Sequence, residues 1–371
     1  MKKVLSILKS VSLIAIAFIL TAFIGQSYGF DTVTSGSVGV AGFALVKIPT
    51  SSLAAGLDLS AIVSEIELHF RKFNNVIWTN IMKGVDFEQY MRPVAGVKGE
   101  YVNTNAVRST FLQPFQKAFT ASGDITLTPY KNYVRRIKMD VLMDNLHELF
   151  DTYLAEIMVD ETRTPDNYPF VRWFIDNHVI PGIQEEMNAI SVKGEYVAPT
   201  PGTPGASLES TDGVFTIIAN EITAGNLTNI ITTGAITSSN VVDKLEQFHK
   251  DMPAEWKKIA GPIFLPEDVL EMYRYTFRDD KGVYPSIDVS NPVDRLWGTN
   301  KTLIGLPDLN GSQRIMFTPT GANGNLLKLY DSLMMPVPTF QLFERSVKIL
   351  GDFHRGYGFQ SLDAVFVNDQ A

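Results

Sequence analysis

Apolar positions that recur every three or four residues mark three helices along the chain. This spacing predicts an amphipathic helix over Leu59–Lys72 and a second one over Val241–Lys250. A longer run, Pro169–Ile190, places Trp173 and other large apolar residues mostly at helical spacing, and Pro181 is expected to kink it. We expect this run to be the longest helical element.

Short strand-like pieces separated by glycines fill the region between Phe87 and Thr128. Gly96, Gly99 and Gly123 divide this region, which carries few helical signals. Such a pattern is typical of a long projecting β-hairpin, and we place the projecting loop near residues 94–102.

The remaining strands are predicted from alternation and from turn residues. Val134–Met143 alternates and leads into a helical stretch, and an apolar strand is followed by a helix that starts at Pro266. Two Asn-Gly pairs, Asn310-Gly311 and Asn323-Gly324, each predict a tight hairpin. The last strand is expected in AVFVN, so the class is α+β with segregated helices and antiparallel strands.

Two stretches lack the pattern of a packed element. Residues 31–60 are rich in Gly, Ser, Thr and Ala and predict an extended arm, and Ala198–Ser207, APTPGTPGAS, predicts a boundary or an exposed loop. Residues 1–30 combine a basic start, an apolar core and small residues, as a secretory leader does. A mis-set start codon, a removable propeptide and an arm that packs on a partner subunit fit residues 1–30 as well.

Composition narrows the possible functions. A formal net charge of −8 argues against a protein that holds DNA by bulk electrostatics, and the absence of cysteine excludes disulfides, thiolate nucleophiles and cysteine metal sites. Five histidines are scattered without a metal-ligand spacing. We therefore assign no catalytic, cofactor-binding or metal-ligating residue and do not expect an enzyme.

Two charged clusters invite a chemical interpretation. Asp279-Asp280 resembles a carboxylate pair, but its place after a helix favours a solvated turn. Arg135 and Arg136, beside Lys138, form the main basic cluster, which would meet phosphate or pair with acids of a neighbouring chain.

The order of the elements and the C-terminal sequence resemble the major capsid protein of tailed bacteriophages, which has the Hong Kong 97 fold. The stretches that carry the resemblance are IFLPEDVLEMYRYTFRDDKGVY, DRLWGTNKTLIGLPDL, RIMFTPTGANGNLLKLYD and FQLFERSVKILGDFHRGYGFQSLDAVFVN. More weakly, NHVIPGIQEEMNAISVKGEYVAPTPGTPGA resembles the spine helix and the chain that leaves it, in a form similar to phages of Bacteroidetes hosts. The resemblance covers about residues 31–371.

The resemblance implies an N-terminal arm, an extended β-hairpin loop, a peripheral domain with a long spine helix, and an axial domain. The expected boundaries are a leader or propeptide at 1–29, the arm at 30–85, the extended loop at 86–128, the peripheral domain at 129–197, the axial domain at 198–350 and a C-terminal strand returning to the body at 351–371.

The implied function is structural: hexamers and pentamers of an icosahedral shell around double-stranded DNA, assembled in the bacterial host cytoplasm and carried in the virion. The implied partners are copies of the chain itself, portal and other capsid proteins, and packaged DNA held without sequence-specific contacts. Because residues 1–29 are like a secretory leader, a transient membrane contact through them, or export of the chain, is also compatible with the sequence. No cofactor is implied.

Candidate subunit-interface residues are Gly96, Lys98, Gly99, Arg135 and Arg136. Some relatives crosslink subunits through a lysine–asparagine isopeptide bond, and Lys98, which we place near the loop tip, is a conceivable donor. No acceptor matches, so we assign no crosslink.

Two other functions stay open at this point. A cellular nanocompartment of the same fold would enclose an enzyme rather than DNA. A secreted or surface binding protein would follow if the leader acts as one.

Overall fold

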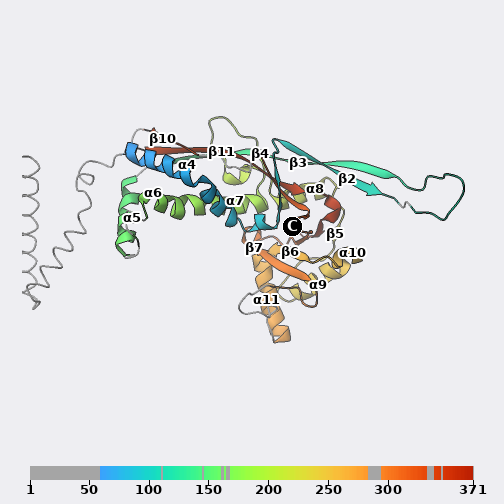
Figure 1. Ribbon diagram of the computed structural model, residues 1–371. Helices are drawn as coiled ribbons and strands as arrows, with labels where there is room; N and C mark the ends of the chain where they lie inside the picture. The colour runs from blue at the N-terminus through green and yellow to red at the C-terminus, as the bar shows by residue number, and fades with distance from the viewer. Residues whose placement is uncertain are drawn as a thin grey trace, which may run out of the picture. The chain divides into compact units, whose positions relative to one another are not determined.

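The computed structural model describes residues 59–109, 112–143, 146–159, 163, 168–282, 294–331, 338–343 and 346–370 (Figure 1). The chain divides into two units, Met1–Ile62 and Val63–Ala371, and the elements below belong to the second unit apart from the start of the first helix. The leader and the extended arm expected from the sequence lie outside the described residues.

The helices and strands follow one another in mixed order. The helices are α4 Leu59–Lys83, α5 Leu146–Val159, α6 Phe170–Phe174, α7 Ile180–Lys193, α8 Val214–Thr223, α9 Val241–Asp251, α10 Ala254–Lys257 and α11 Glu267–Lys281, with the single turns η1 Phe87–Tyr90, η2 Ile175–Val179, η3 Ser207–Glu209, η4 Pro307–Leu309 and η5 Leu362–Ala364. The strands are β1 Arg92–Ala95, β2 Glu100–Arg108, β3 Ile125–Tyr133, β4 Arg135–Met143, β5 Ile230–Ile231, β6 Gly261–Pro266, β7 Lys301–Leu306, β8 Met316–Phe317, β9 Leu326–Tyr330, β10 Thr339–Phe343, β11 Ser346–Phe359 and β12 Phe366–Asn368.

One five-stranded sheet is organised around β11, the longest strand. Its order is β1-β9-β11-β10, and β4 also pairs with β11. The pairing with β4 is antiparallel and ends at Arg355↔Arg135, after which β9 takes over at Gly356↔Leu329. Segments from very different parts of the sequence therefore meet on one strand.

A second sheet, in the order β5-β12-β8-β6-β7, carries a large apolar core. Strand β6 of this sheet is buried along almost its whole length, and helices α9 and α11 supply Leu245, Phe248, Val269 and Tyr273 to the core. The helix predicted to start at Pro266 is confirmed as α11, with acidic residues in its first turn, where the helix dipole favours negative charge.

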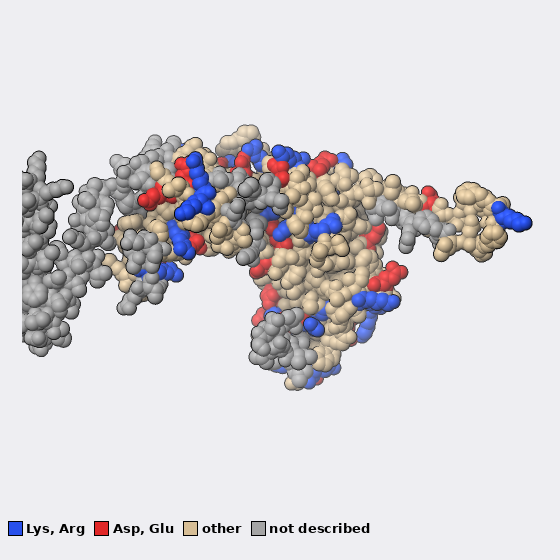
Figure 2. All heavy atoms as spheres, viewed as in Figure 1, with Lys and Arg blue, Asp and Glu red and all other residues tan. Residues whose placement is uncertain are grey.

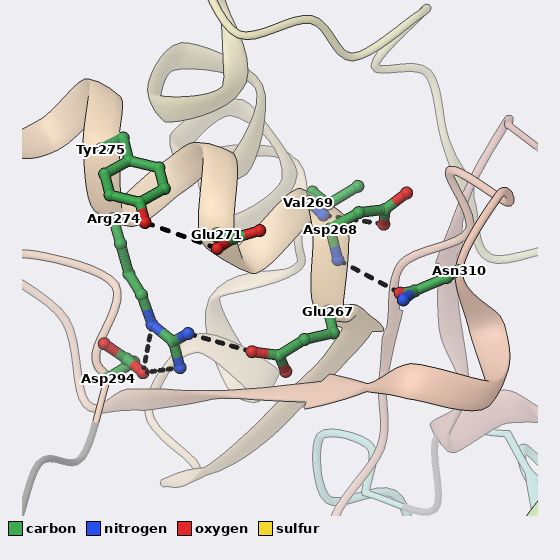
Figure 3. A network of polar contacts seen from close by, with 8 residues as sticks. All are labelled: Glu267, Asp268, Val269, Glu271, Arg274, Tyr275, Asp294 and Asn310. Atoms are coloured by element: carbon green, nitrogen blue, oxygen red, sulfur yellow. Dashed lines mark hydrogen bonds and ion pairs between the residues drawn. The ribbon is translucent and has the colours of Figure 1, made fainter.

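An arginine on α11 holds the chain that leads into β7 (Figure 3). Arg274 donates to Asp294 Oδ2 from Nε at 3.0 Å and from a terminal nitrogen at 2.7 Å, and to Glu267 Oε1 at 2.9 Å. At the start of the same helix the Asp268 amide donates to Asn310 Oδ1 at 3.2 Å. The planar guanidinium group has several N–H donors in fixed directions, so it can donate to two carboxylates at once.

The expected spine helix consists of α6, a π-helical turn at Ile175–Val179, and α7. Pro181 lacks the N–H that would continue the helical bonding, and the widened turn lies directly before it. The expectation that this would be the longest helix is wrong, because α4 runs on to Lys83 and spans 25 residues.

Neither Asn-Gly pair forms the predicted hairpin. Strand β7 pairs in parallel with β6, and β8 lies between β6 and β12, so Asn310-Gly311 connects strands that are not neighbours. Strand β9 pairs with β1 and β11 in the other sheet, so Asn323-Gly324 connects two sheets. Pairing with distant strands, which buries more apolar surface, overrides the local turn preference here.

The projecting hairpin exists, but its position differs from the one expected. Strands β2 and β3 pair over nine residues each, from Glu100↔Tyr133 to Arg108↔Ile125, and residues 109–124 join them. The expectation that residues 94–102 project is wrong, because β1 pairs with β9 inside the first sheet. Figure 1 shows the hairpin leaving the rest of the Val63–Ala371 unit.

The C-terminal strand is fixed by a carboxylate beyond it. Asp369 Oδ1 accepts hydrogen bonds from the Thr233 amide at 2.9 Å and the Gly234 amide at 3.0 Å. Partial burial acts to raise the pKa of Asp369, but hydrogen bonds from Gln370 and from these amides outweigh it and lower the pKa to about 2.

Asp369→Asn should remove a pH-dependent part of the stability. Because the folded pKa lies below the ordinary value of 3.8, the carboxylate stabilises the fold above about pH 4, and this contribution is lost as the pH falls through about 2. The side chain is exposed, so solvent screening limits the effect to about 1 kcal/mol. Urea midpoints of both proteins should differ at pH 6 and converge toward pH 2, whereas a constant difference would assign the effect to something other than the charge.

Candidate subunit-interface site

The end of the hairpin exposes apolar side chains. Leu112, Phe115 and Phe119 are 90%, 93% and 96% exposed. The described residues of this end contain few charges, and Figure 2 shows it mostly without acidic or basic atoms. Large apolar side chains exposed together mark a contact surface. The sequence carried this signal in LQPFQKAF, but we assigned no interface residue there.

Three of the predicted interface residues lie at the opposite end, at the root of the hairpin. Gly96 and Gly99 adopt left-handed φ angles of 82° and 96°, which a turn between β1 and β2 requires. Lys98, between them, pairs with Asp331 at 3.3 Å. The placement of Lys98 near the loop tip is therefore wrong, since residues 109–124 form the tip.

The two arginines follow the root on β4. The Arg135 guanidinium stacks over the Tyr196 ring at 3.8 Å and lies 5.2 Å from the Tyr133 ring. Arg136 forms an ion pair with Asp352 on β11. Each arginine is thus held by groups of its own chain.

One groove of about 1490 Å³ brings four of the five predicted residues together. Its lining includes Lys98, Gly99, Arg135 and Arg136, with further walls from α7 and from the segment 196–210, whereas Gly96 does not contribute. Apolar side chains such as Ile137 and Met187 lie beside the charged ones. The predicted basic cluster and the predicted proline-rich loop therefore line the same cavity.

The charges around this groove do not favour a phosphate ligand. Lys98, Arg136 and Lys138 each have a carboxylate partner within the chain. Figure 2 shows acidic and basic atoms intermixed on the visible face. Neutralised cations release few counterions on binding DNA, so this surface suits contact with protein better.

A buried ionic centre under the root escaped the sequence analysis. The Tyr357 hydroxyl donates to Glu88 Oε1 at 2.7 Å, and Arg355 and Lys328 lie 3.4 and 3.7 Å from the same carboxylate. Burial, followed by the Glu88 charge, raises the pKa of Tyr357 well above its ordinary value. Residues 88 and 357 are too far apart in sequence for any local pattern to pair them.

The described residues show no arrangement typical of a metal site. They contain no group of three or more metal-ligating side chains, and Asp279 pairs with Arg278 next to it. Lys301 is buried, donates to the carbonyls of Trp256 and Ile259, and lies 3.6 Å from the Phe317 ring centre. Burial lowers the pKa of Lys301 to about 8. Within the described part of the chain, no helix is both long and apolar enough to cross a membrane.

Comparison of the structure with solved structures identifies the fold. The chain is similar to a protein in the satellite phage P4 procapsid that includes the size determination protein, with a TM-score of 0.54 and 11% identity over 80% of this chain and 90% of that one. The chain has the Hong Kong 97 capsid fold. This is the mixed α+β class expected from the sequence.

Two further solved structures are similar to the chain. One is the capsid of an empty GTA particle, with a TM-score of 0.48 and 12% identity over 76% of this chain and 94% of that one. The other is the SrpI encapsulin of Synechococcus elongatus, with a TM-score of 0.45 and 14% identity over 77% and 86%. No family model and no curated protein matches the sequence. The comparisons give no support to a Bacteroidetes host.

Proposed function

We propose that the chain is the major capsid protein of a tailed phage or prophage, which assembles into the hexamers and pentamers of an icosahedral shell around double-stranded DNA. The observation that carries the proposal is the hairpin end, where Leu112, Phe115 and Phe119 are almost fully exposed. A subunit with such a surface is stable in water when a second copy covers it.

The energetics of the hairpin end suit repeated assembly. Full burial of three such side chains contributes about 5–9 kcal/mol per contact before the cost of ordering. This is modest for one pair of subunits, but a closed shell repeats the contact in every copy. The proposal includes copies of the chain, portal and other capsid proteins as partners, and residues 1–29 as a removable leader or a transient membrane contact.

The negative net charge and the paired cations fit a shell that encloses DNA without binding it tightly. The chain carries −8 overall, and the cations of the groove are neutralised by neighbouring carboxylates. DNA would then lie inside the shell without sequence-specific contacts.

Expression of the full chain in a bacterial cytoplasm tests the proposal. We expect closed particles or hexamers by negative-stain electron microscopy, and an intact mass that shows whether residues 1–29 remain. A chain that stays monomeric at high concentration would overturn the proposal and favour a secreted binding protein. Particles that form in the native host and enclose a protein instead of DNA would indicate a nanocompartment.

A further inference from the structure

Beyond the end of the β4–β11 pairing, where β3 passes β11, side chains hold the hairpin to the first sheet. The described residues show no backbone pairing between β3 and β11 where the two strands meet. Instead, Asn132 Oδ1 accepts from the Phe359 amide at 3.0 Å, and Asn132 Nδ2 donates to the Phe359 carbonyl at 3.0 Å. The side-chain amide thus replaces a neighbouring strand.

A second asparagine reaches the same peptide from the other strand of the hairpin. Asn103 Nδ2 donates to the Phe359 carbonyl at 3.0 Å. Asn103 and Asn132 are 4% and 3% exposed, so water does not compete for these bonds. Both strands of the hairpin are therefore fastened to one residue of β11.

Two glycines of β11 make room for this attachment. A Cβ atom on Gly358 would lie 1.8 Å from Asn132 Oδ1, and one on Gly356 would lie 2.2 Å from the Tyr133 carbonyl oxygen. Between them, Tyr357 makes its hydrogen bond to Glu88 in the buried ionic centre. Because side chains alternate along a strand, Gly-Tyr-Gly offers bare backbone to the hairpin and an aromatic ring to the opposite face.

We propose that Asn103, Asn132, Gly356 and Gly358 form an orientation lock, which fixes the direction in which the hairpin leaves the subunit. Opening the lock breaks no strand ladder, because β2 and β3 pair only with each other among the described residues. The chain between β1 and β2 stays attached through the Gly96 and Val97 amides, which donate to the Asp331 and Tyr330 carbonyls. Strand β3 stays attached through Val134 to β4, which is paired with β11, so these two connections together act as a pivot. The hairpin then swings while the body stays folded.

The lock is a property of the single subunit, and only its use in assembly rests on the proposed function. A hairpin held at one angle presents its apolar end at one place, which a closed shell of fixed curvature requires. Asn103 and Asn132 are thus positioning residues for that contact.

A distance measurement between spin labels tests the lock. The chain has no cysteine, so cysteines introduced at Ser122 on the hairpin end and at Glu185 on α7 are labelled without background. Labelled chains are diluted with unlabelled chains to suppress distances between subunits. We expect one narrow distance distribution in the parent and a distribution at least about twofold broader in Asn132→Leu, which removes the amide at similar size.

Hydrogen exchange supplies the second measurement. In Asn132→Leu the Phe359 amide loses its acceptor and should exchange at least about tenfold faster, while the amides of β6 remain slow. Lys131→Ala is the matched control, since it removes an exposed ion pair with Glu100 beside Asn132 and should change neither readout. Asn103→Ala removes one of the three hydrogen bonds to Phe359 and should broaden the distance distribution less than Asn132→Leu does. If Asn132→Leu does not fold, Asn103→Ala alone tests the lock.

These measurements test the orientation lock independently of the proposed shell function. Folded variants that keep both the narrow distribution and the slow Phe359 exchange would overturn the lock, whether or not particles form. Broadened distributions in a chain that never forms particles would support the lock and leave the shell function refuted.

Discussion

Replacing Trp173 with alanine should lower the free energy of unfolding of the subunit by about 3–5 kcal/mol. The side chain is 1% exposed, and its indole Nε1 donates to Glu156 Oε2 on α5 at 2.5 Å. Its ring contacts Tyr153, Phe170 and His178, with centroids 5.0–5.8 Å away. The substitution leaves a cavity where α5 meets the start of the spine helix. Urea unfolding of unassembled subunits measures the loss.

Two further variants separate cavity formation from other effects. Trp297→Ala makes the same substitution at a half-exposed site, where a side chain beside Phe277 contributes less, and should cost about 1 kcal/mol. Trp173→Phe keeps most of the buried volume but loses the bond to Glu156, and should cost less than Trp173→Ala. Equal losses at Trp173 and Trp297 would contradict the packing explanation.

Elements whose signals are local could be predicted from the sequence. The strand and helix around Pro266 have an apolar run, acidic residues in the first turn and Gly282 at the end, and all of these act within a few residues. The same holds for the helix at Val241 and for the strand that ends at Met143. The π-helical turn before Pro181 was not predicted, because only its proline carries a local signal.

Features that depend on distant partners could not be predicted. The Asn-Gly pairs are strong turn signals, yet the strands beside them pair elsewhere: β7 pairs with β6, and β9 pairs with β11. These partners lie too far along the sequence for a local pattern to indicate them. The hairpin tip was misplaced for a related reason. Gly96 and Gly99 predict the middle of a projecting loop, whereas in the structure they form the turn between β1 and β2 that leads into the hairpin.

The candidate site shows the same division. Lys98, Arg135 and Arg136 were chosen as charged or turn residues near an expected loop, and the fold does bring them to one groove. Their carboxylate partners are Asp331, which directly follows β9, and Asp352 on β11. Both lie more than 200 positions away in the sequence, so no local pattern shows that the cluster is neutralised. Asn132 was overlooked because an asparagine in a strand has no distinctive pattern, although its bonds to Phe359 fix the hairpin.

These partners share a physical cause. In the first sheet, β11 receives β4, β9 and β10 on its edges and the hairpin root on its glycines. Strand β11 thus contacts β4 and the hairpin, which lie about 200 residues before it in the sequence, as well as the nearby β9 and β10, and no pattern within β11 indicates these partners. The proposed assembly surface is positioned by long-range contacts, whereas its three apolar side chains lie within eight residues of one another in the sequence.

Exchanging the apolar hairpin end for a polar one should abolish closed particles without unfolding the subunit. The variant is Leu112→Ser, Phe115→Ser and Phe119→Ser together. These side chains are at least 90% exposed, so the subunit loses almost no internal packing and its melting temperature should stay within about 1 °C. Each contact between subunits loses about 5–9 kcal/mol of apolar burial, before the cost of ordering is subtracted. Negative-stain microscopy and light scattering should find subunits or small oligomers at concentrations where the parent forms particles.

The single variant Phe115→Ser and a polar control make the result specific to apolar burial. Phe115→Ser removes about 1.5–3 kcal/mol per contact and should raise the concentration needed for particles about 10- to 100-fold. Gln116→Ser with Lys117→Ser alters the same loop at exposed polar positions and should leave particle formation unchanged. Particles of normal size from the triple variant would show that the hairpin end lies free in the shell and that other surfaces join the subunits. Loss of particles from the polar control as well would contradict a contact that depends on apolar burial, since Gln116 and Lys117 are polar side chains on the same loop.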